Sequence, residues 1–343
     1  MNADVMADLA DFDATEDHDE LRRINADLER RLRRAKAKTD DLVAAVFDGA
    51  QAAMRAYGPI PPVKAPKLAK AKGRPEVALW DLGDWQGAKH TPSYNSTIMV
   101  ERVMRFCAKA TKITQGQRSD HPVDDCTIIF GGDMVEGLFN FPSQVFEIDQ
   151  TLFGQFVTVS RLIHDVVRYA LAHHRHVTVV PEWGNHGRIG SKRDAVPRSD
   201  NIDRMCFEMA HQLLADEPRL TWQDCPEDIQ RLEIGNYRAL VIHGDEIGRN
   251  GFASPSTLVA WATRQKSGAY PWAFQDVYLH HYHTHAEWAL PDGQGAVYQT
   301  GSTESDNRYA GVTMAASAIP SQRLHFIGPD AGRVTAQYKI FVD

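Results

Sequence analysis

The chain has 343 residues and a mass of 38.4 kDa, with 43% hydrophobic and 24% charged residues. This composition predicts a protein with a large core, and no stretch reaches the roughly 18 to 20 apolar residues that a membrane-spanning helix requires. The net charge of −7 argues against a uniformly basic nucleic-acid binder, and without a secretory signal or paired cysteines we expect a cytoplasmic protein with reduced thiols.

The N-terminal segments are distinguished by charge and periodicity. Residues 1–17 are rich in Asp and Ala and are expected to form a disordered acidic tail. Residues 18–57 predict a helical arm, because apolar residues recur at three- and four-residue spacing. We favour a short coiled coil that makes a homo-oligomer over the alternative, a helix that packs on the domain that follows it in the same chain. The apolar positions of the arm are Leu21, Ile24, Leu28, Leu32 and Ala35.

Residues 58–75 predict a linker, because they are rich in Pro, Lys and Ala. With the preceding arm they concentrate positive charge, since residues 21–75 hold 14 Lys or Arg against five acidic residues. Such a basic stretch either contacts phosphate backbones or is a solvated linker.

Residues 76–343 have the pattern of one α/β domain, in which short apolar runs alternate with helical patterns. Helices are predicted near 95–112, 151–174 and 201–215. This alternation is typical of an α/β domain whose active site gathers at strand ends. The predicted strands are Val77–Leu82, Thr127–Phe130, Val177–Val180, Tyr237–His243 and Asp276–His280, with further strands at 296–300, 323–327 and 333–342.

Residues of the types that bind metals follow five of these strands. Carboxylate oxygens, amide oxygens and neutral imidazoles suit Mn²⁺, Fe²⁺ or Zn²⁺. A pair of metals needs a shared carboxylate and several further ligands, so the ligands must come from separate strand ends. In chain order the residues of these types after the strands include Asp84, Gln86, Asp133, Asn185, His186, His243, His283 and His285.

The order and content of these blocks resemble the calcineurin-like metallophosphoesterase superfamily. That superfamily shows D-x-H, G-D, G-N-H, a lone His and G-H-x-H. Between about residues 77 and 300 the chain has Asp84-x-Gln86, Gly132-Asp133, Gly184-Asn185-His186, His243 and His283-x-His285, in that order. The resemblance implies an αββα sandwich of two mixed β-sheets flanked by helices, two divalent metal ions and hydrolysis of phosphoesters.

The resemblance also implies a role for each residue. Asp133 would bridge the two metals, and His186 would lie near the scissile phosphate as a general acid or as a stabiliser of the transition state. Asp84, Gln86 and His285 would complete one metal site, and Asn185, His243 and His283 the other.

Three departures from the superfamily pattern affect these expectations. Gln86 replaces the usual His, and its hard amide oxygen favours Mn²⁺, with Fe²⁺, Zn²⁺ or Mg²⁺ as alternatives. Gly187 replaces the acid that often follows G-N-H, so His186 needs another partner, for which we suggest Asp245. Tyr282 replaces the usual Gly of the last motif. Of the adjacent His280 and His281, one is interpreted as structural and the other stays unassigned.

The substrate is predicted from the second block, Gly132-Asp133-Met134-Val135-Glu136-Gly137. It lacks the Arg of the protein-phosphatase motif G-D-x-V-D-R-G and is similar to the SbcD-type DNA-repair exonuclease branch, including phage-encoded members. We therefore expect a Mn²⁺-dependent phosphodiesterase or nuclease acting on DNA. The alternatives are a small-molecule phosphodiesterase or nucleotidase, and a non-catalytic assembly module with a degenerate metal site.

Basic residues close to the third block are candidates for holding substrate phosphates. Arg188, Lys192 and Arg193 follow Gly184-Asn185-His186 and are expected to lie near the metals. The segment Arg249–Tyr270 combines cations with aromatic rings, as single-strand binding sites do, or forms a helix that packs Trp261 into the core.

Overall fold

A computed structural model describes residues 61–68, 71–140, 144–190, 198–248, 253–307 and 319–343, together with six isolated positions of the N-terminal arm. Those six positions are helical: Arg23, Ala26, Arg30, Ala44, Asp48 and Gly49. The acidic tail and the rest of the predicted arm lie outside the described residues, so the coiled coil stays a prediction. Gly49 lies beside the Phe153 ring, since a Cβ added at Gly49 would be 3.2 Å from it.

The first sheet has six strands in the order β11-β10-β1-β2-β3-β4. Strands β1 to β4 run parallel, and β10 and β11 add antiparallel strands at one edge. The strand bounds are Val77–Leu82 (β1), Asp125–Gly131 (β2), His176–Glu182 (β3), Leu220–Trp222 (β4), Ser321–Gly328 (β10) and Arg333–Phe341 (β11).

The second sheet has five strands in the order β5-β6-β7-β9-β8 and is also mixed. Its central strands β6, β7 and β9 run parallel, and the edge strands β5 and β8 pair antiparallel with their neighbours. The bounds are Gln230–Ile234 (β5), Tyr237–Ile242 (β6), Asp276–Leu279 (β7), Ala286–Ala289 (β8) and Ala296–Gln299 (β9).

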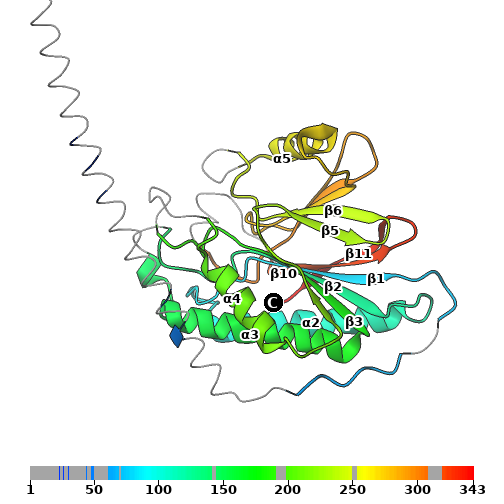
Figure 1. The fold of residues 1–343 in the computed structure, drawn as a ribbon, viewed down its shortest axis with the longest axis horizontal. Helices are drawn as coiled ribbons and strands as arrows, with labels where there is room; N and C mark the ends of the chain where they lie inside the picture. Colours follow the sequence, from blue (N-terminus) through cyan, green and yellow to red (C-terminus); the bar gives the residue numbers. More distant parts are fainter. Residues whose placement is uncertain are drawn as a thin grey trace, which may run out of the picture.

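Helices cover the outer face of each sheet, which makes the domain a four-layer αββα sandwich (Figure 1). Helices α2 (Ser96–Gln117), α3 (Leu152–His173) and α4 (Ile202–Leu213) pack on the first sheet, and α5 (Pro255–Arg264) packs on the second. A short helix η1 (Gln144–Phe146) precedes α3, and η2 (Gln265–Ala269) continues α5. The predicted fold class, with two mixed sheets flanked by helices, is confirmed.

The apolar core is divided into three layers by the two sheets. The largest cluster lies between the first sheet and its three helices, a second fills the space between the sheets, and a third lies under α5. Each long helix begins at a side-chain cap, such as Asn95 Oδ1 accepting from Ile98 N at 3.0 Å, because the first turn leaves its N–H groups unpaired. Trp261 of α5 packs in the third layer, in agreement with the structural interpretation of its segment.

The described part of the predicted linker forms no helix or strand and runs along the domain. Val63 N donates to Glu217 Oε2 at 3.0 Å, and Arg219 Nη2 donates to Val63 O at 2.6 Å. This stretch is therefore held on the domain beyond the end of α4. Across the part of the chain that the structure describes, no helix is both long and apolar enough to cross a membrane.

Candidate metal centre

The polar side chains of the site come from loops that follow the carboxyl ends of parallel strands. Asp84 and Gln86 follow β1, Asp133 follows β2, and the other members follow β3, β6 and β7. Backbone hydrogen bonds tie the first two loops together, with Asp84 N donating to Gly132 O and Gln86 N to Asp133 O, both at 2.9 Å. The parallel arrangement thus gathers residues that are up to about 200 positions apart in sequence at one edge of the sandwich.

Two groups of ligand-type atoms form where these loops meet. One group contains Asp84, Asp133 and His283, and the other contains Asp133, His243 and His281; within each group all the ligand atoms lie within 4.8 Å of one another. Asp133 belongs to both groups, as a bridging carboxylate must. Because carboxylates and imidazoles are metal ligands, the geometry is that of two adjacent sites with one shared residue.

Amide side chains stand beside each group. Asn185 Oδ1 lies 3.3 Å from His243 Nε2, which itself lies 3.2 Å from Asp133 Oδ2. Gln86 Nε2 lies 3.3 Å from Asp133 Oδ2 and 3.2 Å from His283 Nε2. Both predicted amide residues are therefore placed where an amide oxygen could join the carboxylate and the imidazole around one cation.

The surroundings of the Gln86 amide fit a cation. Its NH₂ group points at two acceptors, Asp133 Oδ2 and the His283 ring nitrogen, while its Oε1 is buried with no hydrogen-bond partner among the described residues. Rotating the amide by half a turn would place the oxygen among those acceptors. A buried oxygen without a hydrogen-bond partner costs free energy. A divalent cation placed between the Gln86 amide oxygen, Asp133 Oδ2 and the His283 ring nitrogen would give each of these three atoms a partner.

The backbone of the site is held in an unusual conformation. Seven described non-glycine residues have a positive φ, and five of them belong to this site. Residues other than glycine rarely adopt this left-handed backbone conformation, and those that do are often found at functional sites. The five residues and their φ angles are Asp84 (50°), Gln86 (49°), Asp133 (52°), His281 (72°) and His283 (57°).

Glycines allow the loops to approach one another closely, as two positions show. A Cβ on Gly184 would lie 2.1 Å from Asp133 Oδ1, and a Cβ on Gly131 would lie 2.0 Å from the His280 ring. Any larger residue at either position would therefore displace a loop of the site.

The charges at the centre interact strongly. Burial opposes ionisation of Asp133, but the adjacent His243 and His186 lower its pKa well below the usual range. Burial lowers the pKa of His243, but the interaction with Asp133 raises it by more, so the pKa of this imidazole lies well above its usual value. Asp133 is thus an anion at neutral pH, as a bridging ligand needs to be.

His186 lies beside the two groups and is oriented by Glu136. Its Nδ1 lies 2.9 Å from Glu136 O and 3.3 Å from Glu136 Oε2, and its Nε2 lies 3.9 Å from Asp133 Oδ2. The two nearest partners of Nδ1, both oxygens of Glu136, are acceptors, and the Gln144 amide nitrogen is more distant at 3.5 Å, so Nδ1 carries a proton and Nε2 faces the metal groups. Burial opposes the charge, but Asp133 and Glu136 raise the pKa of His186 to about 9. Buried Lys89 pairs with Glu136 at 3.2 Å and holds that carboxylate in place.

Asp245, suggested from the sequence as the partner of His186, has other contacts. It pairs with Arg188 at 3.4 Å and with Arg198 at 3.2 Å. Glu136 has the role instead, because it lies on the same loop as Asp133 and its carbonyl and carboxylate both reach the ring. Arg188, one of the predicted phosphate-binding residues, is therefore near the centre but is paired with a carboxylate. The other two, Lys192 and Arg193, lie outside the described residues.

The last histidine motif is shifted by two residues from its predicted position. His283 lies in the group expected for His285, and His281, which was unassigned, lies in the group expected for His283. His285 is in neither group. It lies near Arg323 and Lys339, and its burial together with these two cations lowers its pKa to about 3. The positive charge around His285 makes this a poor position for a metal cation. The prediction for His285 is corrected accordingly.

The adjacent His280 is structural. Its ring is fully buried, and its Nε2 lies 2.9 Å from Asp81 Oδ1. Since Asp81 is in β1 and His280 follows β7, this pair joins the two sheets directly beneath the centre. With the corrected register, His280 occupies the position before the first His of the motif, and Tyr282 lies between the two ligand-type histidines.

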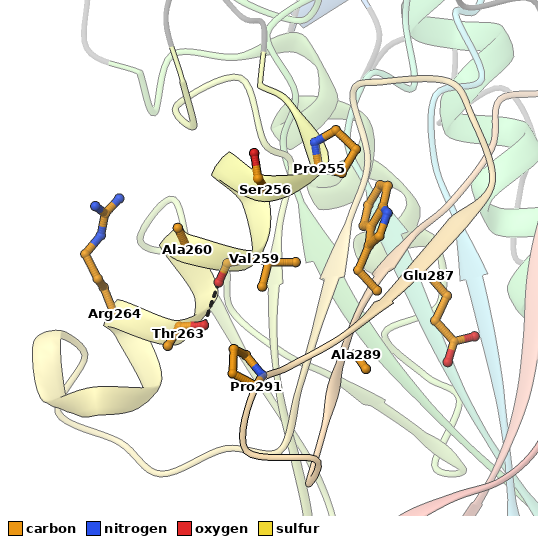
Figure 2. A pocket seen from close by; sticks show the side chains of 10 residues that line it. Pro255, Ser256, Val259, Ala260, Thr263, Arg264, Glu287, Ala289 and Pro291 are labelled. Atoms are coloured by element: carbon orange, nitrogen blue, oxygen red, sulfur yellow. Dashed lines mark hydrogen bonds between the residues drawn. The ribbon is translucent and has the colours of Figure 1, made fainter.

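A separate groove of about 850 Å³ lies on the outer face of the second sheet, between α5 and β8. Figure 2 shows Pro255 and Val259 of α5 opposite Glu287 and Ala289 of β8. None of the predicted ligands lines this groove, so the groove is separate from the candidate centre.

No family model matches the sequence, and no curated protein matches it either. Solved structures similar to this chain include Vps29 complexed with Zn²⁺ from Entamoeba histolytica, at 12% identity over 78% of this chain and 99% of that one, with a TM-score of 0.34. A hypothetical protein from Pyrococcus horikoshii is 13% identical over 78% of this chain and 89% of that one, with a TM-score of 0.37. YfcE, a phosphoesterase from E. coli, is 13% identical over 78% of this chain and 100% of that one, with a TM-score of 0.33. These likenesses are too distant to bear on activity, so function is argued from the side-chain geometry.

Proposed function

We propose that this chain is a two-metal phosphoesterase of the calcineurin-like type. The proposal is carried by one observation: Asp133 is shared by two groups of ligand atoms, each completed by residues from both sheets. Asp84, Gln86, Asp133 and His283 would hold one ion, and Asp133, Asn185, His243 and His281 the other. Bound there, two divalent ions supply Lewis acidity toward a phosphoryl oxygen and a nucleophile at neutral pH.

The protein itself contributes a proton donor to the reaction, the His186 side chain. The Nε2 of His186 faces the two groups, and Glu136 fixes the ring through Nδ1. A protonated Nε2 at this position can donate to the oxygen that leaves phosphorus. This role requires no contact between His186 and a metal, and it is one of the two roles that the sequence resemblance implies.

The finer proposal is a Mn²⁺-dependent phosphodiesterase that acts on DNA. Gln86 supports manganese, since a hard amide oxygen replaces an imidazole in one site. The glycine pattern of the second block and the basic residues 21–75 support a nucleic-acid substrate. These sequence features are the support for both parts of the finer proposal.

A substrate panel with metal titration tests the proposal. The full chain, freed of metal with a chelator, is incubated with bis(p-nitrophenyl) phosphate and with single- and double-stranded DNA, adding Mn²⁺, Mg²⁺ or Zn²⁺. We expect no turnover without metal, and the fastest turnover of the ester and of DNA with Mn²⁺. Ester turnover without DNA cleavage would identify a small-molecule phosphodiesterase. Two bound ions without turnover of any substrate would identify a non-catalytic module.

The pH profile of a Glu136→Gln variant tests the acid. The negative charge of Glu136 helps to raise the pKa of His186, and the protonated form is present below that pKa and lost above it. Removing the charge lowers the pKa, so the alkaline fall in kcat should begin at a lower pH than in the unchanged chain. Glu147→Gln is the control, because Glu147 contacts Lys89 but is half-exposed. An unshifted alkaline limb in Glu136→Gln would contradict the assignment.

A further inference from the structure

Glu304 contacts one of the candidate ligands from behind. Its Oε1 lies 2.5 Å from Nδ1 of His283, and the carboxylate is almost fully buried. Glu304 lies on the segment that follows β9, and it belongs to none of the sequence motifs of the site. It is therefore outside the ligand set of the proposed function.

The contact determines which ring nitrogen of His283 can bind a metal. A carboxylate in this contact accepts, so Nδ1 carries the proton and the lone pair is on Nε2. That nitrogen lies 3.5 Å from Asp84 Oδ1 and 3.2 Å from Gln86 Nε2. Glu304 thus points the unprotonated nitrogen of His283 at the first group.

Glu304 is itself held firmly. Ser302 Oγ accepts from Glu304 N at 2.9 Å and donates to Asp84 O at 2.6 Å, so one serine connects Glu304 to the Asp84 loop. Asn307 Nδ2 donates to Glu304 Oε1 at 2.8 Å. A support whose own position is fixed can orient a ligand, whereas a mobile carboxylate could not.

The second group has a different support. Nδ1 of His243 lies 2.8 Å from the backbone carbonyl of Gly131, which is a neutral acceptor. A carboxylate acceptor makes an imidazole a stronger donor to a metal than a carbonyl does. The two groups therefore differ in the acceptor behind the histidine, a carboxylate for His283 and a carbonyl for His243, and a single substitution can remove the carboxylate.

We infer that Glu304 is a positioning residue that strengthens the first metal site, the one formed by Asp84, Gln86, Asp133 and His283. The inference rests on the proposed function, because it requires that these residues bind a metal. It also explains how a site that has Gln86 in place of an imidazole can retain its ion: the carboxylate behind His283 offsets the weaker amide ligand.

Stepwise metal binding by a Glu304→Gln variant tests the inference. Equilibrium dialysis against Mn²⁺ gives the number of bound ions and the affinity of each in the full chain. The unchanged chain should bind two ions. In Glu304→Gln one ion should bind about 10- to 100-fold more weakly, and the other should keep its affinity. Glu304→Asp, which keeps a shorter carboxylate, should fall between the two.

A matched control separates positioning from folding. Glu76→Gln removes another buried carboxylate, at the opposite end of β1 from the centre, and should leave both affinities unchanged. Equal binding of both ions by the unchanged chain and by both Glu304 variants would overturn the inference while leaving the proposed function intact. Equal weakening of both ions, together with a lower metal-free unfolding temperature, would also overturn it. No binding by the unchanged chain would instead refute the proposed function.

Discussion

Replacing Asp133 by Asn should abolish turnover and remove metal together. Asp133 is the residue common to both groups of ligand atoms, and an amide cannot bridge two cations as a carboxylate does. We expect kcat for bis(p-nitrophenyl) phosphate with Mn²⁺ to fall at least ~10³-fold, which corresponds to about 4 kcal/mol of transition-state stabilisation. Elemental analysis of the dialysed protein should show fewer than two ions per chain.

The fold should survive this change. Asn keeps an oxygen that can accept from the backbone N–H of His186, as Asp133 Oδ1 does at 2.7 Å. Asp330→Asn, in the exposed turn between β10 and β11, is a control of the same chemical type and should behave as the unchanged chain. Full activity of Asp133→Asn, with two ions bound, would refute the two-metal proposal.

Replacing His186 by Gln should slow the reaction by an amount that depends on the leaving group. An alkoxide leaving group, as in DNA, needs a proton, so cleavage of a dinucleotide or of DNA should fall by about 10²- to 10⁴-fold. A p-nitrophenolate leaves as a stable anion, so the rate on its ester should fall less than about tenfold. The ratio of the two effects is the measurement.

Metal binding should be retained in this variant, since His186 belongs to neither group of ligand atoms. His176→Gln, at the opposite end of β3 from the centre, provides the control and should leave both rates unchanged. An equal loss on both substrates would assign His186 to binding of the phosphoryl group rather than to proton donation.

Much of the fold could be predicted from the sequence because buried parallel strands are continuous apolar runs. β1, β2, β3, β6 and β7 lie where those runs predicted strands, and α2, α3 and α4 lie where apolar residues recur at helical spacing. The short strands β4, β5 and β8 were missed. With three to five residues, on sheet edges, they have too little periodicity to be distinguished from loops.

The residue types of the site could also be predicted, since each candidate ligand follows a strand and the first four blocks also contain glycines. The sequence could not decide the register of the last motif. His281-x-His283 and His283-x-His285 have the same spacing, so local pattern favours neither. The choice is made by the left-handed backbone at His281 and His283, which aims both rings at the centre, whereas His285 lies directly before β8, near Arg323.

The sequence by itself predicted the buried central strands and the order of the candidate metal-binding blocks, because these depend on local composition and on short spacings. The expectation that Asp133 is the shared carboxylate came from the family resemblance. Only the tertiary structure decided which residues stand behind the ligands. Glu136 orients His186 across 50 positions and Glu304 orients His283 across 21. No motif contains these pairs, because they exist only where loops from separate strands are brought within hydrogen-bonding distance.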